Sequence, residues 1–295
     1  MRKVISLVSL VLVALSGSAL AQEEAPAGDT AAAPANDGAA TMAPTLPASP
    51  ISAPPVGSTY VSRGLTVGAG ALQVTLPVVT YLSKGTILKP VWIPLELRLG
   101  LTDRLDVVLS HNAFGLPPGF RAVGVCLGGK DRSCPKVYDN FNLGMELSFL
   151  KQAGVELSGI GAFEFRSLDP LRLAVDLGLA FKYNGGPLAI KAAAQIGLAV
   201  NKRVEQVKEF IAVPVQVALQ ATHGLAVFLD TGVFGQTDHF SQEYAVPVGV
   251  GAVLAVMPIL DVGAEFMLPL AVTEIEDDRA FDTRTLMVYA ALRTK

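Results

Sequence analysis

Three features are scarce in this 295-residue chain: long apolar runs, an excess of basic residues, and aromatic side chains. Beyond the N-terminus no apolar run reaches the length of a membrane helix. Lys and Arg number 23 against 26 Asp and Glu, a formal charge of -3, which argues against the clustered basic surface of a nucleic-acid-binding protein. Yet the chain is 51% hydrophobic with a mean hydropathy of +0.46, although only 7% is aromatic. Apolarity without a helical span favours a transmembrane β-sheet.

The N-terminus has the layout of a secretory signal. Arg2 and Lys3 precede an apolar stretch over 4–15, and Ala19-Leu20-Ala21 before Gln22 forms an Ala-x-Ala cleavage site. We therefore expect residues 1–21 to be a signal peptide. No cysteine lies near the site, which argues against a lipid-anchored mature end. Removing the two bases lowers the formal charge from -3 to -5. The expected destination is the cell envelope.

Residues 22–58 are of low complexity. Alanine and proline dominate, and large apolar side chains are almost absent. Such a composition buries too little surface to offset the entropy of ordering, so we predict a disordered periplasmic linker and assign it no chemistry.

The hairpin over 92–112 indicates the architecture of the rest. From Ile93 to Leu101 every second residue is Ile or Leu, and the residues between are Pro, Glu, Arg and Gly. Because neighbouring strand side chains point to opposite faces, one face is apolar and the other charged. Thr102-Asp103-Arg104 suits a tight turn, and 105–112 repeats the alternation.

The same alternation recurs to the end of the chain and predicts about twelve strands, an even number as in single-chain outer-membrane barrels. The first is the least regular, because Gly68 and Gly70 suggest a bend or bulge. The segment 244–256 has small residues on its second face, at Ala245, Gly249 and Gly251 among others, which leaves room for bulkier neighbours inside. The predicted fold class is all-β, a closed antiparallel transmembrane barrel over 59–295. The principal strand segments are 65–81, 92–101, 105–112, 141–150, 155–165, 171–182, 188–198, 211–220, 225–230, 244–256, 260–268 and 285–293.

The connections alternate in length. Those near residues 102, 151, 184, 223 and 257 are short, whereas those at 83–90, 115–139, 200–208, 236–243 and 273–282 are mostly longer and polar, the tight link 166–169 being the exception. Bacterial barrels have short periplasmic turns and longer extracellular loops, so we expect both termini to be periplasmic.

The hairpin sequence also carries a family resemblance. Gly100-Leu101-Thr102-Asp103-Arg104-Leu105 is similar to the periplasmic Gly-Leu-Thr-Asp-Arg-Leu hairpin of bacterial outer-membrane β-barrel and porin-like proteins, and Leu260-Asp261-Val262 echoes its outgoing half. The resemblance implies an integral outer-membrane barrel that contacts membrane lipid and the barrel-assembly machinery. Protomers of trimeric porins are larger, so a monomer is expected.

The second face of the predicted strands is ionic, and its acids outnumber its bases. A water-filled lumen lined in this way favours cations and suits a narrow channel for small polar or cationic solutes. The alternatives are a barrel plugged by paired charges, since small barrels are filled by side chains, and a structural envelope protein. The predicted lumen-lining residues are Glu96, Arg98, Asp106, Glu146, Glu156, Glu164, Arg172, Asp176, Lys182, Lys191, Asp230, Asp261 and Glu265.

The longest loop, 115–139, contains both cysteines of the chain. In an oxidising compartment Cys126 and Cys134 are expected to form an intraloop disulfide. Two thiols without an adjacent histidine give too few ligands for a metal, so we expect no metal and no cofactor. Lys130, Arg132 and Lys136 make the loop a candidate surface contact or constriction, with a solvated face as the alternative.

A hydrolase is the competing function. His239-Phe240-Ser241 resembles the His-x-Ser of outer-membrane phospholipases, but no asparagine follows Asn201 to orient the base. Asp238-His239 together with Asp277-Asp278 resembles omptin-type protease sites, although the spacing and order differ. We therefore predict a protein that is not an enzyme.

Overall fold

The computed structural model describes residues 59–82, 87–111, 124–127, 134, 136–138, 140–203, 207–238, 240, 244–273 and 283–294. A short 3-10 helix, η1 (Tyr60–Ser62), precedes the strands, and none of the helices in these residues has the length and apolarity to cross a membrane. The strands are β1 (Leu72–Tyr81), β2 (Val91–Ile93), β3 (Glu96–Gly100), β4 (Leu105–Ser110), β5 (Val125–Leu127), β6 (Phe141–Gln152), β7 (Val155–Leu168), β8 (Leu171–Gly185), β9 (Leu188–Ala199), β10 (Glu209–Gln220), β11 (Leu225–Gln236), β12 (Tyr244–Met257), β13 (Leu260–Thr273) and β14 (Thr285–Arg293).

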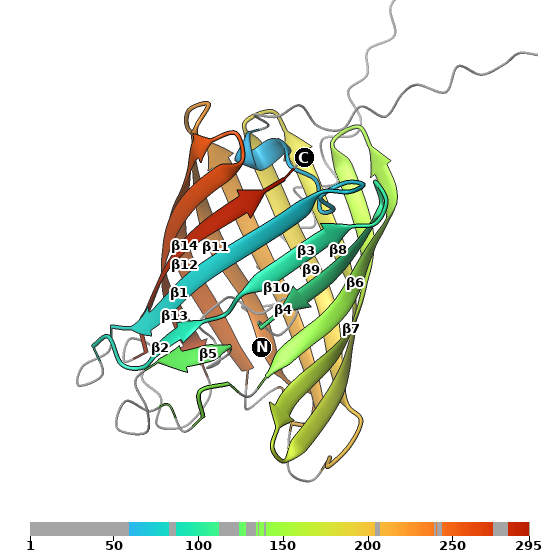
Figure 1. Cartoon of the computed structure of the whole chain (residues 1–295), viewed down its shortest axis with the longest axis vertical. Coiled ribbons are helices and arrows are strands. Elements are labelled where there is room, and N and C mark those ends of the chain that lie inside the picture. Colours follow the sequence, from blue (N-terminus) through green and yellow to red (C-terminus); the bar gives the residue numbers. More distant parts are fainter. Residues whose placement is uncertain are drawn as a thin grey trace, which may run out of the picture. The chain divides into compact units, whose positions relative to one another are not determined.

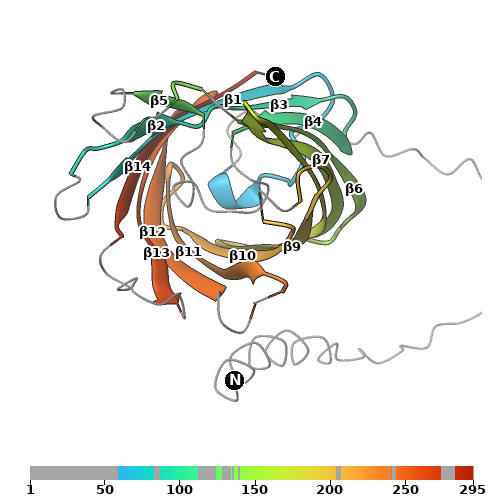
Figure 2. The same ribbon diagram turned by 90° about the horizontal axis from the view of Figure 1, so that it is seen from below.

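The strands form one antiparallel sheet that closes on itself (Figures 1 and 2). Neighbours along the chain pair with each other, and the pairing of β1 with β14, from Gln73↔Arg293 to Tyr81↔Thr285, completes the ring. Of the 14 strands, β2 and β3 both pair with β1 and are two parts of one wall strand, while β5 is an added strand on the edge of β2. Twelve wall strands remain, so the predicted closed antiparallel barrel is confirmed.

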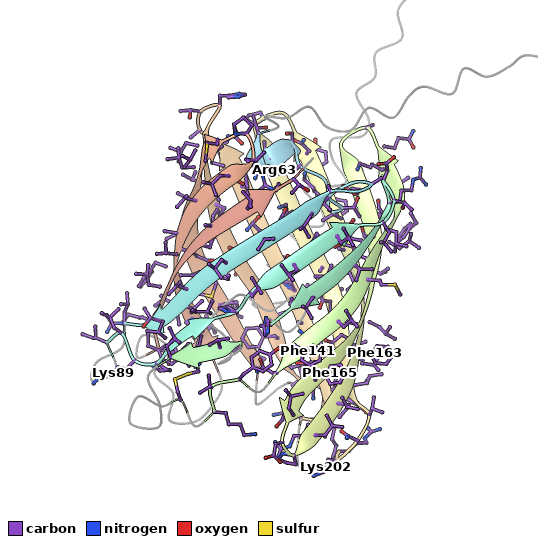
Figure 3. All side chains as sticks on the ribbon, viewed as in Figure 1. Arg63, Lys89, Phe141, Phe163, Phe165 and Lys202 are labelled. Atoms are coloured by element: carbon purple, nitrogen blue, oxygen red, sulfur yellow. A yellow bond between two sulfur atoms is a disulfide. The ribbon has the colours of Figure 1, made fainter. Side chains whose placement is uncertain are left out.

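The apolar face of the strands points away from the barrel axis. In β6 the exposed residues Leu143, Met145 and Leu147 alternate with buried Asn142, Gly144 and Glu146. Figure 3 shows side chains projecting from the outer face of the ribbon, with Phe163, which is 63% exposed, among them. This is the reverse of a soluble sandwich, in which the aliphatic rows would pack against each other. The charged residues buried in the interior are Asp106, Glu146, Glu156, Glu164, Asp176, Lys182, Asp261 and Glu265.

Two strand boundaries differ from the sequence prediction. The predicted first strand, 65–81, begins only at Leu72, and the residues before it run inside the barrel. The predicted strand 92–101 is interrupted after Ile93, because Pro94 has no N–H to donate to a sheet ladder. Gly68 and Gly70 indicated an irregularity in the first segment, whereas the alternating pattern of the second gave no sign of the interruption at Pro94.

The tight connections at 101–104, 153–154, 186–187, 221–224 and 258–259 lie at the end of the barrel where the chain enters and leaves the wall, whereas the tight link between β7 and β8 lies at the opposite end. Gly70 N–H donates to Gly100 O at 2.8 Å, beside the 101–104 turn, and Gln73 pairs with Arg293. We call this the short-turn end and the opposite one the long-loop end. The alternation of short and long connections therefore corresponds to the two ends of the barrel.

The small residues of β12 and β13 make room for larger neighbours. A Cβ at Gly251 would collide with the Phe228 ring and with the backbone of Ala264, and one at Gly263 would collide with the Tyr289 ring. The prediction that the second face of 244–256 accommodates bulky groups agrees with this packing.

Candidate functional site in the barrel interior

The interior of the barrel holds the chain's own residues 59–71, which we call the inner segment. Figure 2 shows η1, coloured blue, within the ring of strands. The inner segment crosses the bore near the short-turn end. Ala69 N–H donates to Asp103 Oδ1 at 3.2 Å on one side, and Tyr60 Oη donates to Gln216 Oε1 of β10 at 3.0 Å on the other.

Wall carboxylates hold the backbone of the inner segment at alternate residues. Leu65 N–H donates to Glu156 Oε2 at 2.8 Å, and Val67 N–H donates to Asp106 Oδ2 at 2.9 Å. The N–H of Ala69, two residues further, donates to Asp103. Acidic side chains of the wall and of the 101–104 turn therefore hold the inner segment through three backbone N–H groups spaced two residues apart.

Arg63 supplies the ionic anchor of the inner segment. Its two Nη atoms lie 2.5 and 3.0 Å from the Oδ atoms of Asp261, a bidentate pair. Arg293 of β14 also pairs with Asp261, whose side chain is 2% exposed. One buried carboxylate thus carries two guanidinium groups, one from the wall and one from the inner segment.

Apolar contacts complete the attachment at η1. Val61 is buried in a cluster with Ala218, Phe228 and Val253, and the Tyr60 ring stacks on Phe228 with centroids 6.3 Å apart. Burial of the Tyr60 phenol is the main cause that raises its pKa above the ordinary value, and the nearby Asp230 carboxylate raises it further. Tyr60 therefore stays protonated and can keep donating its hydrogen bond.

A second ionic cluster centres on Arg98 of β3. Its Nη1 lies 2.6 Å from Glu146 Oε2 and 3.5 Å from Asp106 Oδ2, and its Nε lies 3.7 Å from Glu96 Oε1. The same Nη1 donates to Leu65 O at 2.7 Å. Four of the predicted lumen residues therefore meet at one point, where a single base faces three acids.

A third group lies across the bore, on β9, β11 and β13. Glu265, Asp230 and Lys191 line the bore there together. Lys191 Nζ lies 4.8 Å above the Tyr60 ring in a cation–π contact, and Gln216 Nε2 donates to Asp230 Oδ2 at 3.4 Å.

These groups line a cavity of about 460 Å³ between the inner segment and the wall. Its ionisable lining has five carboxylates, Glu96, Glu146, Asp230, Asp261 and Glu265, and four bases, Arg63, Arg98, Lys191 and Arg293. The formal excess is one negative charge. The pocket is lined by ionic groups and has room for a few small molecules or ions.

The other predicted lumen residues lie apart from this cavity. Glu156 and Lys182 line a second cavity of about 310 Å³ near the short-turn end, together with Lys151. Nearer the long-loop end, Glu164 Oε2 pairs with Arg166 Nε at 2.7 Å. Arg172 and Asp176 stand on β8, and Asp176 is buried.

The sequence analysis did not identify the site residues of the inner segment and of the last strand. Tyr60, Arg63 and Arg293 were absent from the predicted set, and Arg166 was assigned to a connection. One signal was available: between residues 22 and 71 Tyr60 is the only aromatic and Arg63 the only base. These two residues are also the ones that anchor the inner segment in the bore.

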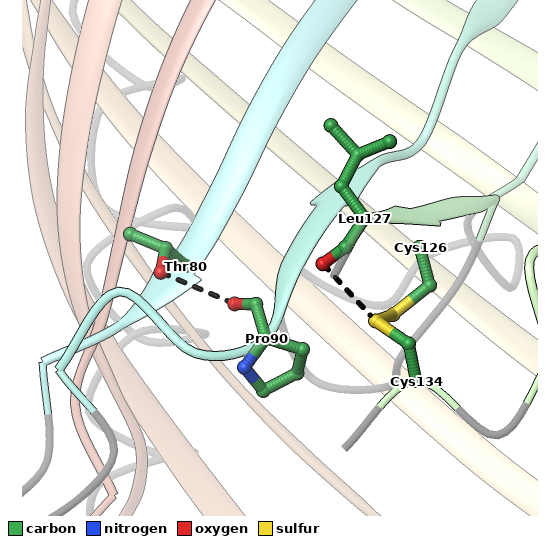
Figure 4. The surroundings of a disulfide bond; sticks show 5 residues. All are labelled: Thr80, Pro90, Cys126, Leu127 and Cys134. Atoms are coloured by element: carbon green, nitrogen blue, oxygen red, sulfur yellow. Dashed lines mark hydrogen bonds between the residues drawn. A yellow bond between two sulfur atoms is a disulfide. The ribbon is translucent and has the colours of Figure 1, made fainter. Parts of the chain in front are cut away.

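The disulfide lies at the long-loop end. Cys126 and Cys134 are bonded, with Cα atoms 5.6 Å apart (Figure 4). Both belong to a buried cluster with Trp92 of β2. Cys126 pairs with Trp92 in the sheet, and Thr80 Oγ1 donates to Pro90 O at 3.1 Å beside them. Lys130 and Arg132 lie outside the described residues, whereas Lys136 Nζ reaches the Asp169 carbonyl oxygen.

Most of the residues considered for a hydrolase site lie outside the part of the chain that the structure describes, whereas a metal site can be examined among the described residues. His239, Ser241, Asp277 and Asp278 lie outside the described residues. Across the residues that are described, no group of three or more His, Cys, Asp or Glu side chains is arranged to hold a metal ion.

A closed twelve-stranded antiparallel barrel with an apolar exterior and an ionic bore is the architecture of outer-membrane porin-like proteins. No family model and no curated protein matches the chain. Among solved structures, the NanC porin is similar with a TM-score of 0.53 over 74% of this chain and 98% of that one, at 5% identity. The KdgM porin gives 0.50 over 75% and 98%, also at 5% identity. KdgM porin in complex with disordered oligogalacturonate gives 0.51 over the same shares, at 6%. At such identities the likeness establishes the fold.

Proposed function

We propose that this protein is an integral barrel of a bacterial outer membrane that passes small polar or cationic solutes. The observation that carries the proposal is the inversion of the usual pattern, with aliphatic rows exposed outside and ionisable groups buried inside. Exposing that much apolar surface is costly in water and favourable in hydrocarbon. The likeness to porins in fold supports the same conclusion.

The charge of the bore supports a preference for cations. The cavity lining has five carboxylates and four bases, and Asp106 adds another buried acid beside Arg98. Arg98 faces three carboxylates, and Lys191 lines the cavity together with Asp230 and Glu265, so acids outnumber the base in both groups. Small cations are therefore the solutes that the lining stabilises.

The same geometry supports a proposal for the arrangement in the cell. With the short-turn end in the periplasm, both ends of the wall lie on that side, where a signal peptide over 1–21 and a disordered linker over 22–58 would leave the mature N-terminus. The barrel would be inserted by the barrel-assembly machinery, contact lipid around its whole wall and act as a monomer without a cofactor. An enzymatic role has no support from the described residues.

Planar-bilayer recording tests the proposal. Purified protein in a KCl gradient should give discrete conductance steps with a reversal potential of cation-selective sign. Persistent silence, including in variants with a weakened inner segment, would contradict a channel. If the purified protein cleaved phospholipid or peptide, and His239→Ala abolished the cleavage, the function would be that of a hydrolase.

A further inference from the structure

We infer that the bore at the short-turn end is a peptide-binding site, that the inner segment 59–71 is its reversible occupant, and that this occupant gates the channel. The inference rests on the proposed channel function and adds a mechanism of closure. The contacts across the bore join the inner segment to β3, β4, β7, β10 and β13, so its departure would clear the passage between the two cavities.

The first argument is the nature of the contacts. The inner segment runs through the bore unpaired with any wall strand until Gly70 and Ala71, where two main-chain hydrogen bonds to Gly100 begin the β1 ladder. Up to that point separate side-chain contacts from the wall hold it, each of which water can replace. A plug that belonged to the folded core would bury a larger apolar surface, whereas here Val61 is its one side chain in the buried cluster.

The second argument is the hinge. Gly68 and Gly70 have φ values of +94° and +70°, a backbone region that other residues rarely adopt. They lie at the end of the inner segment, just before β1 starts at Leu72, where the chain turns from the bore into the wall. Rotation at these two glycines would swing residues 59–67 out through the short-turn end without breaking the wall.

The third argument concerns the charges that stay in the bore after the inner segment has left. When Arg63 leaves, Asp261 keeps Arg293 as its partner, so no buried charge is left uncompensated. The cavity lining then has five carboxylates and three bases. An open state is therefore physically sustainable and has a stronger cation preference than the closed one.

Full-length variants test the gate in planar bilayers. Tyr60→Ala with Arg63→Gln removes the ring contact and the bidentate pair, and Arg104→Gln is the matched control, because it removes a base from an exposed turn at the same end. Since hydrogen bonds to charged groups contribute about a tenfold factor in an equilibrium, we expect the ratio of closed to open time to fall roughly tenfold in the double variant. The control should behave as wild type. The double variant should also be more cation-selective.

A synthetic peptide with the sequence of residues 59–71 probes the site directly. Added at the short-turn side of the double variant, it should close the channel again, whereas a peptide with the tyrosine and arginine replaced by alanine and glutamine should not. If the double variant conducts and its conductance does not differ from that of the wild type, the gate is refuted.

Amide hydrogen exchange separates failure of the gate from failure of the channel. In a reversible occupant the amides of Leu65, Val67 and Ala69 exchange faster than those of β1, and faster still in the double variant. Exchange as slow as in β1, in both proteins, would make the inner segment a fixed part of the barrel and refute the inference even if nothing conducts. Silence in the bilayer combined with fast exchange would count only against the channel. Heat-modified mobility on gels verifies that each variant is folded.

Discussion

At the scale of single residues, Arg98 is the central base of one ionic cluster in the barrel interior. It contacts Glu96, Asp106 and Glu146, and all three acids face the interior; among the residues that the structure describes, no other base forms an ion pair with them. Buried carboxylates without a cation are strongly unfavourable because the bore replaces little of their hydration. The stability of the wall near β3, β4 and β6 therefore depends on this guanidinium.

Replacing Arg98 by Met should lower the free energy of unfolding by about 3–5 kcal/mol, the usual cost of removing one partner from a buried ionic group. Urea unfolding of the barrel in lipid vesicles measures it. Arg104→Met, at an exposed turn, is the control and should change little. Adding Glu146→Gln to Arg98→Met should recover part of the loss. If Arg98→Met were as stable as the control, the three acids around Arg98 would not depend on its charge for the stability of the barrel.

Gly251 gives a second residue-scale prediction. A methyl group there meets the Phe228 ring and the backbone of Ala264, so Gly251→Ala should destabilise by about 1–3 kcal/mol through overpacking. Gly159→Ala is the matched control, because no atom lies within 4 Å of its added Cβ. The same unfolding assay compares them, and equal stabilities would contradict the packing described for β12.

At the scale of elements, strands were predictable and the inner segment was not. Side-chain alternation is local, so β6, β7 and β8 follow from the sequence within a few residues. The path of residues 59–71 depends on acids far along the chain, such as Asp261, which no local pattern reveals. The same holds for the pairing of predicted lumen residues: their common face was predictable, but their partners depend on register across the sheet.

The disulfide-linked β5 gives a prediction for an element. Trp92 is the only tryptophan of the chain, is 4% exposed and meets Tyr81 edge-on at 4.9 Å. Because Cys126 and Cys134 pack on the same cluster, replacing both by Ser should loosen β5 and expose the indole. We expect a red-shifted emission and stronger acrylamide quenching. The barrel itself should keep its heat-modified mobility on gels, and unchanged quenching would mean that β5 stays in place without the bond.

At the scale of the whole molecule, the account depends on the direction of the two strand faces. Leu143, Met145 and Leu147 lie on the outer face of β6, and Glu146 is buried within. Met145→Arg should therefore cost about 2–4 kcal/mol in a bilayer, as a cation near the midplane of a lipid-facing wall does. In a water-soluble protein the same exposed substitution would be nearly neutral.

The most direct measurement is quenching of a single tryptophan by lipids brominated along their acyl chains. In a Trp92→Phe background, Met145→Trp places the probe on the outer face of β6, and Arg104→Trp places it at the 101–104 turn. The account predicts strong quenching at 145 by mid-chain bromines and little at 104. An unquenched, water-like emission at position 145 would show that the apolar face does not meet hydrocarbon, and would contradict the membrane barrel.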